Sequence, residues 1–149
     1  MSTRKTFKEY RNEENKVNEA IINTVPEYDY SQDFIKQSMC AVSALHMNHL
    51  LTKDATKHDV IGEIYASVLG FTDQLAEIYL GTGGKIDEEY ECIFTPTGDS
   101  MFAEKILVSL REGIKNQLMK EEDGLESFHE ILEQYRIMID KSLYKLDMK

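Results

Sequence analysis

The sequence contains no tryptophan, only two prolines and only two cysteines among its 149 residues. Because proline interrupts helices, so low a content leaves room for long ones. Cys40 and Cys92 lie in apolar surroundings without the spacing of a metal site, so we expect reduced thiols in a cytoplasmic protein. No apolar run approaches the ~20 residues of a membrane-spanning helix, and we expect no membrane partner.

Basic residues are also scarce, since 17 Lys and Arg face 27 Asp and Glu, which gives a formal net charge of −10. That balance argues against broad binding to DNA phosphates and suits the attraction of cations. Residues 1–11 are the exception, with Arg4, Lys5, Lys8 and Arg11, so DNA binding would have to use this N-terminal arm. Hydrophobic residues at 42% and charged residues at 30% are typical of one globular domain.

Apolar residues recur at helical spacing in four segments and predict an all-α fold. The predicted helices cover residues 31–51, 57–80, 100–120 and 125–146, preceded by an arm or weak helix over residues 1–30. The links between the helices are short, long and short. The long link, residues 81–99, reaches about 60 Å when extended, enough to run the length of a ~36 Å helix. This pattern predicts a ferritin-like four-helix bundle over residues 31–149, with one long crossover between the second and third helices.

The same periodicity predicts core residues and helix ends. We expect Gly81, Gly83 and Gly84 to end the second helix, and Asp99 or Ser100 to cap the third. The predicted core stripes of the first two helices are Ile35, Met39, Val42, Leu45, His49 and Leu50, then Ile61, Tyr65, Val68, Thr72, Leu75 and Tyr79.

Four polar residues inside these apolar segments are candidate metal ligands: His46, His58, Asp73 and Glu77. The histidines are twelve residues apart, the aspartate follows fifteen residues after the second, and the glutamate four later. Imidazole together with carboxylate suits iron, zinc or manganese better than calcium or magnesium. The alternative is two ordinary histidines beside a polar helix border.

The spacing also indicates a second subunit. On one helix over residues 57–80, His58 and Asp73 lie about 60° apart around the axis but about 22 Å apart along it. Metal–ligand bonds are only ~2.0–2.2 Å long, so one chain cannot bring both to one ion. An antiparallel copy across a two-fold axis would place His58 of one chain beside Asp73 and Glu77 of the other, at two equivalent sites.

The stretch over residues 43–84 resembles the Dps family, the mini-ferritins that protect DNA in starved cells. His46-Met47-Asn48 matches the family's His-Trp-Asn element, and His58 matches its histidine twelve residues on. Asp73-Gln74-Leu75-Ala76-Glu77 matches its Asp-x-x-Ala-Glu element, and Tyr65 falls where the family often has tyrosine. The resemblance implies a dodecamer with an iron-oxidising centre between subunits, for storage or detoxification. A basic N-terminal tail holds DNA in some members.

The sequence departs from the family at Gly62, which stands where the first carboxylate ligand is expected, and at Met47 and Ile78, which replace tryptophan and arginine. Glu63 is adjacent to Gly62 but points about 100° away on an ideal helix. We therefore expect iron binding at His46, His58, Asp73 and Glu77 with weak or slow oxidation. The alternative function is a ferritin-like binding or structural module that has lost ferroxidase turnover.

Overall fold

The computed structural model describes residues 30–120 and 125–148. In these ranges it contains no strand and four helices: α2 (Tyr30–Leu51), α3 (Ala55–Gly81), α4 (Ser100–Leu118) and α5 (Glu126–Asp147). The prediction of an all-α four-helix bundle is confirmed, and each predicted helix end lies within two residues of the observed one. The predicted arm over residues 1–30, apart from Tyr30, lies outside the described residues. So does Asp123-Gly124, a sequence that predicts a tight break between the last two helices.

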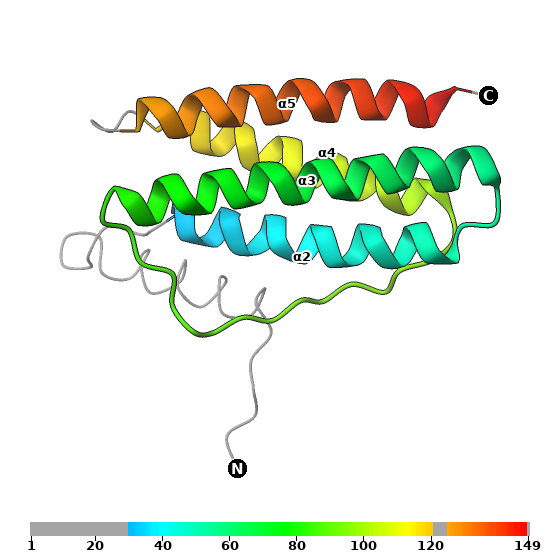
Figure 1. Ribbon diagram of the computed structural model, residues 1–149, viewed down its shortest axis with the longest axis horizontal. Helices are drawn as coiled ribbons and strands as arrows, with labels where there is room; N and C mark the ends of the chain where they lie inside the picture. Colours follow the sequence, from blue (N-terminus) through cyan, green and yellow to red (C-terminus); the bar gives the residue numbers. More distant parts are fainter. Residues whose placement is uncertain (1–29, 121–124, 149) are drawn as a thin grey trace, which may run out of the picture.

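The four helices form a bundle in which α2 packs beside α3, α4 packs beside α5, and α3 and α4 lie diagonally opposite. α2 contacts α3 and α4, while α5 contacts the same two helices from the opposite side. Figure 1 shows that α2 and α3 run in opposite directions, as do α4 and α5. α3 and α4 therefore run in the same direction, and the chain between them must return along the whole bundle.

Local side-chain chemistry sets the helix ends. The carboxylate of Asp54 accepts a hydrogen bond from the backbone N–H of Lys57 at 2.9 Å and caps α3. Asp99 caps α4 by accepting from the N–H of Met101 at 3.0 Å, as predicted. α3 ends where Gly83 adopts a φ of 94°, which lets the N–H of Gly84 reach the carbonyl of Tyr79 at 2.9 Å.

The core lies between the four helices, and the predicted stripe of α3 is nearly correct. Five of its six residues are buried, whereas Tyr65 is half-buried and Ile64 takes its place. The predicted stripe of α2 is largely wrong: Ile35 and Leu45 are buried, but Leu50 is 60% exposed. The buried side of α2 is instead centred on Phe34, Ser38, Ala41 and Leu45.

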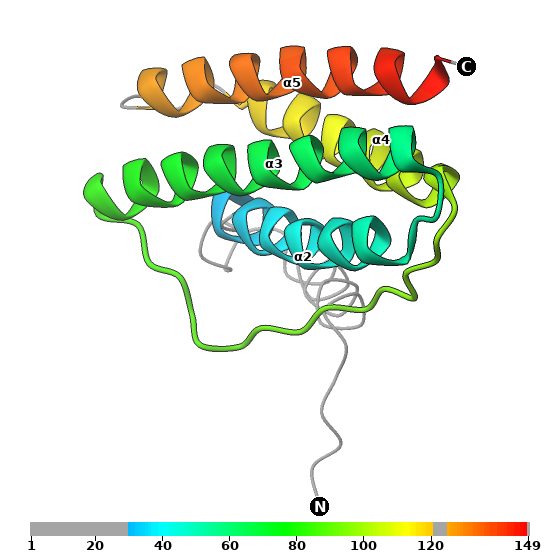
Figure 2. The same cartoon turned by 45° about the vertical axis from the view of Figure 1, so that its right-hand side comes forward.

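The connection over residues 82–99 explains this difference, because it covers a second side of α2. Lys36 pairs with the carboxylate of Asp87 and donates to the carbonyl of Glu89 at 2.6 Å. Further along the helix, Asn48 donates to the carbonyl of Asp99 at 3.0 Å. Figures 1 and 2 show the connection running beside α2 from the end of α3 to the start of α4.

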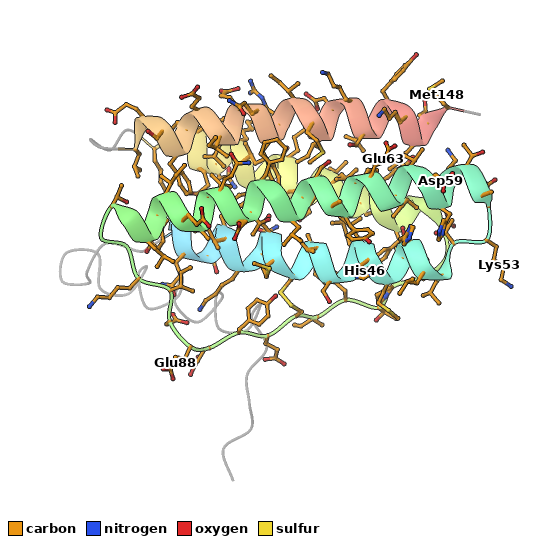
Figure 3. The ribbon with its side chains drawn as sticks, viewed as in Figure 1. His46, Lys53, Asp59, Glu63, Glu88 and Met148 are labelled. Carbon is orange, nitrogen blue, oxygen red and sulfur yellow. A yellow bond between two sulfur atoms is a disulfide. The ribbon has the colours of Figure 1, made fainter. Side chains whose placement is uncertain are left out.

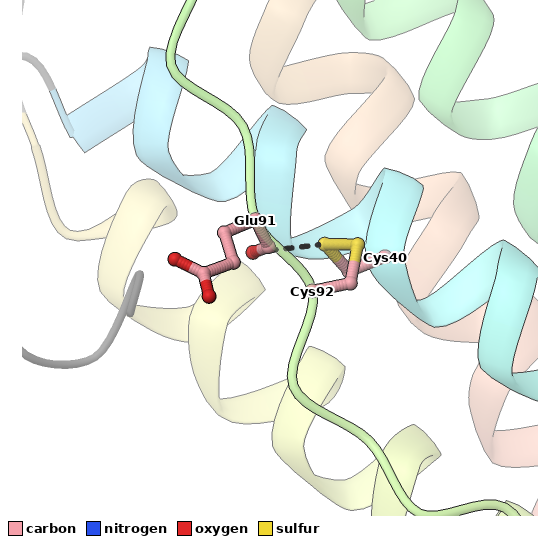
Figure 4. Close-up of a disulfide and its surroundings, with 3 residues drawn as sticks. All are labelled: Cys40, Glu91 and Cys92. Atoms are coloured by element: carbon pink, nitrogen blue, oxygen red, sulfur yellow. Dashed lines mark hydrogen bonds between the residues drawn. A yellow bond between two sulfur atoms is a disulfide. The ribbon is translucent and has the colours of Figure 1, made fainter. Parts of the chain in front are cut away.

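A disulfide joins the same connection to α2, so the expectation of two reduced thiols is wrong. Cys40 and Cys92 are bonded, with their Cα atoms 5.3 Å apart (Figure 4). The Sγ of Cys40 also lies 3.6 Å from the carbonyl oxygen of Glu91. The two cysteines are separated by 52 residues, and only the return path of the connection brings them together. The argument for a cytoplasmic location from free thiols therefore no longer holds.

A small polar network lies at the centre of the bundle. The hydroxyl of Ser38 is 2.8 Å from that of Tyr135 and 2.5 Å from that of Thr72, and all three residues are buried. Burial raises the pKa of Tyr135, an effect that the hydrogen bonds with Ser38 and Thr72 partly oppose. Among the described helices, none is both long enough and apolar enough to cross a membrane.

Candidate metal site

The two predicted histidine ligands lie near the corner between α2 and α3. His46 is exposed on α2, and its ring stacks on that of Tyr65 of α3, with centroids 4.4 Å apart and planes 18° apart. Figure 3 shows His46 on the part of α2 that approaches this corner, where Lys53 lies. His58 is half-buried in the second turn of α3. Both predicted histidines are therefore at the surface between these two helices.

A third histidine, His49, is paired with His58 across the corner. The rings of His49 and His58 stack with centroids 3.8 Å apart and planes 25° apart. The Nδ1 atom of His49 lies 2.7 Å from the carbonyl oxygen of His58. In return, the Nδ1 atom of His58 lies 2.8 Å from the carbonyl oxygen of His49. The two residues thus hold the end of α2 against the start of α3.

These two contacts fix the tautomers of both rings. A carbonyl oxygen can only accept a hydrogen bond, so Nδ1 of His49 and of His58 must carry a proton. In a neutral imidazole the other nitrogen, Nε2, then has a free lone pair. Metal-binding histidines commonly donate their second N–H to a backbone carbonyl, which orients the ring and sets the tautomer. Each ring, taken singly, therefore has the hydrogen-bonding arrangement of a metal-binding histidine.

The predicted carboxylates lie far from the histidines in the same chain. Asp73 and Glu77 are exposed on α3, which continues unbroken from Ala55 to Gly81. Fifteen residues of helix separate His58 from Asp73, or about 22 Å. Within the described part of one chain, no three histidine, cysteine, aspartate or glutamate side chains are grouped closely enough to hold a metal. A metal site built from the predicted residues would need ligands from a second subunit.

The position of the expected first carboxylate, Gly62, faces His49. A Cβ atom at Gly62 would lie 2.9 Å from Cε1 and 3.1 Å from Nδ1 of the His49 ring. The neighbouring Glu63 does not take over in this chain, because its carboxylate lies 3.6 Å from Nζ of Lys145 on α5. Figure 3 shows Glu63 on the side of α3 that faces α5.

Asn48, which matches the family element beside His46, has a structural role. It is fully buried, and its side-chain amide donates to backbone carbonyls of residues 97 and 99, where the long connection enters α4. Helical periodicity places His49 in the predicted core stripe of α2, whereas its pairing with His58 was not predicted. The sequence contains a signal for this pairing, because the two histidines flank the short polar link between α2 and α3, in which Asp54 caps α3.

Comparisons of the chain with protein-family models, with curated proteins and with solved structures gave no match.

Proposed function

We propose that this chain is a ferritin-like protein of the Dps type that binds iron at sites shared between two subunits. The bundle supports the ferritin-like topology, since the connection over residues 82–99 returns along α2 and α3 and α4 run in the same direction. A four-helix bundle with one such crossover is typical of ferritin-like folds.

In this proposal His46 and His58 of one subunit and Asp73 and Glu77 of the other bind the metal. The observation that carries it is the contact between Nδ1 of His58 and the carbonyl oxygen of His49 at 2.8 Å. This bond leaves the Nε2 lone pair of a half-buried ring free, which is the arrangement that a metal-binding histidine needs. The two carboxylates supply negative charge for Fe²⁺ and stabilise Fe³⁺ after oxidation.

The exposed face formed by α2 and α3 suits a two-fold contact. It carries large apolar side chains that are about half exposed, namely Met47 at 46%, Leu50 at 60%, Leu69 at 45% and Leu80 at 51%. Where such side chains form one contiguous patch, that patch marks a protein–protein interface more often than free surface. An isologous dimer through this face would pair His58 of each chain with Asp73 of its partner. The dodecamer rests on the resemblance to Dps proteins.

The expected activity is slow oxidation of Fe²⁺ to Fe³⁺ by oxygen or peroxide. Gly62 offers no carboxylate, so the site has fewer anionic ligands than the family pattern and stabilises Fe³⁺ less. Binding of iron for storage or detoxification is thus a better-supported role than rapid turnover. A cytoplasmic location and DNA binding through the N-terminal arm stay predictions.

A second function is supported by the reciprocal bonds between His49 and His58. These bonds join the end of α2 to the start of α3, so both histidines could serve only to hold the corner. In that case the chain is a ferritin-like binding or structural module without metal chemistry.

Replacing His58 with asparagine separates the two functions. Asparagine keeps a donor near the position of Nδ1, so the bond to the carbonyl of His49 is retained, but it has no counterpart of Nε2. We expect His58→Asn to lose Fe²⁺ binding in anaerobic calorimetry while its melting temperature changes little. His129→Asn on α5 is the matched control and should bind like the wild type. If wild type and His58→Asn bind Fe²⁺ equally, or neither binds it, the structural module is the correct function.

A further inference from the structure

The two cysteines of the disulfide differ in their surroundings (Figure 4). Cys40 lies on α2 and is 5% exposed, whereas Cys92 lies on the long connection and is exposed. A thiolate breaks a disulfide by bonding to one sulfur atom while the other leaves, and access helps to decide which sulfur is attacked. In the folded protein an incoming thiolate therefore reaches Cys92, and Cys40 is the leaving group.

The chain around Cys92 offers a surface on which a protein can dock. Residues 89–97 form neither helix nor strand, and Figures 1 and 2 show them following an elongated course outside α2. Three large apolar side chains of this segment are about half exposed, namely Tyr90 at 47%, Ile93 at 53% and Phe94 at 41%. An elongated segment offers its backbone groups to a partner, and apolar side chains beside them add area that a complex can bury.

The charges near Cys92 disfavour a small anionic thiol. Glu88 and Glu89 are exposed, and Glu91 adjoins the cysteine in the sequence. Figure 3 shows Glu88 pointing away from the bundle. These carboxylates repel a small thiolate with a negative charge of its own, such as glutathione. A protein that buries the apolar side chains of the segment gains binding energy that offsets this repulsion, so the surroundings of Cys92 favour a protein reductant.

We propose that residues 89–97 are the docking segment for a protein with a Cys-x-x-Cys dithiol, which reduces the bond between Cys40 and Cys92. The first thiolate of the dithiol bonds to Sγ of Cys92, the disulfide breaks, and Cys40 leaves as a thiolate that takes up a proton. The second thiolate of the dithiol then attacks the mixed disulfide and releases Cys92, which also takes up a proton. Two electrons pass to this chain, and the partner protein is left with its own disulfide.

Reduction changes the connection without releasing its ends. Lys36 still holds one end through Asp87, and Asn48 holds the other through the backbone carbonyls of residues 97 and 99. Between these two anchors the disulfide is the covalent tie to α2. The reduced protein therefore keeps its bundle, while residues 90–96 gain freedom to move away from α2. The oxidised and reduced proteins are two forms of one fold, and the proposal does not depend on the metal site.

The rate of reduction of the folded, oxidised protein tests this proposal. The probe is purified thioredoxin, kept reduced by its own reductase, and the readout is the number of free thiols trapped over time. We expect thioredoxin to reduce the bond faster than glutathione at the same thiol concentration. If thioredoxin leaves the bond intact, or is no faster than glutathione, the disulfide is structural only and the proposal is wrong.

A double variant tests the docking segment itself. Tyr90→Ser with Ile93→Ser should slow reduction by thioredoxin at least about tenfold, because each side chain is about half exposed and can be buried in the complex. Dithiothreitol is small and uncharged, so its rate and the melting temperature should not change. Phe94 is left in place, since its ring lies edge-on to that of Phe102. Ile137→Ser on α5, where the side chain is 51% exposed, is the matched control and should be reduced like the wild type.

A trapped intermediate identifies the sulfur that is attacked. Thioredoxin with serine in place of its second cysteine cannot release the mixed disulfide, so the complex should accumulate. Peptide mapping should find the bond to thioredoxin at Cys92. A bond at Cys40 would overturn the assignment of the attacked sulfur, and equal slowing of thioredoxin and dithiothreitol in the double variant would overturn the docking segment.

Discussion

The disulfide between Cys40 and Cys92 should contribute a large share of the stability of this fold. It closes a loop with a sequence separation of 52, which contains the α2–α3 corner, all of α3 and half of the long connection. Replacing both cysteines with alanine opens this loop in the unfolded chain. By the loop-entropy relation, that change lowers the free energy of unfolding by about 4 kcal/mol at 25 °C.

Thermal and urea unfolding measure this loss. For a domain of this size, about 4 kcal/mol corresponds to a fall of roughly 8–16 °C in the melting temperature. Helix content should not change, because Lys36 and Asn48 still hold the connection against α2 through their bonds to Asp87, Glu89 and Asp99. Oxidised wild type is therefore expected to differ from the double variant in stability and not in its circular dichroism spectrum.

Dithiothreitol provides the internal control. Reduced wild type should melt close to the Cys40→Ala, Cys92→Ala double variant, and the double variant should not respond to the reductant. A thiol titration of the unreduced, denatured wild type should find no free thiol. If that titration confirms the bond but the double variant is destabilised by less than about 1 kcal/mol, the loop-entropy reasoning is wrong for this chain.

Two further predictions concern the core and the subunit interface. Tyr135→Phe should lower the free energy of unfolding by about 1 kcal/mol near neutral pH, because Ser38 and Thr72 still bond to each other. Because burial raises the pKa of Tyr135 in the folded state above the value near 10 of the unfolded chain, its stabilising contribution is complete below pH 10 and is lost above it. Above pH 10, the free energy of unfolding of the wild type, measured with urea, should therefore fall by about 1.4 kcal/mol more per pH unit than that of Tyr135→Phe. Parallel curves of unfolding free energy against pH would contradict this. If the proposed dimer forms through the exposed face of α2 and α3, Leu69→Lys should convert it to a folded monomer in light scattering, because Leu69 is 45% exposed and contributes little to the core. An unchanged dimer would place the interface elsewhere.

The helices of this protein could be predicted because their signals are local. Aspartate caps precede α3 and α4, glycines end α3, and buried residues recur along α5 at positions 128, 132, 135, 139 and 146. Each signal acts through hydrogen bonds or side-chain burial within a few turns of the same helix. A one-dimensional pattern therefore contains most of the information needed for the helix bounds.

Most of the errors arise where a distant segment covers a helix. The long connection buries Lys36 and Cys40 on a second side of α2. Helical periodicity predicts only one buried stripe per helix, so it does not predict this second side. The disulfide was missed for the same reason, since residues 40 and 92 meet only through the return path of the chain. Leu50, assigned to the core, instead lies on the exposed α2–α3 face.

At the candidate site, the sequence predicts ligand residue types and a second subunit, but it does not predict the geometry around Gly62. The glycine was interpreted as a lost ligand that an aspartate could restore. The structure places the His49 ring 2.9 Å from where its Cβ would be, so restoring the carboxylate means displacing an imidazole. Contact between residues 49 and 62 depends on the angle of the α2–α3 corner, which no residue pattern specifies.

The bond from Nδ1–H to a carbonyl oxygen is what makes the two functions of these histidines hard to tell apart. It is the bond by which a histidine joins two helices, and it is also the bond that prepares Nε2 for a metal. Alanine variants remove both effects at once, so a loss of metal binding in His58→Ala would not distinguish a missing ligand from a loosened corner. Asparagine keeps the donor and removes only Nε2. Stability and metal affinity in the asparagine variants therefore report on different atoms of one ring, and metal affinity should fall while the corner stays intact.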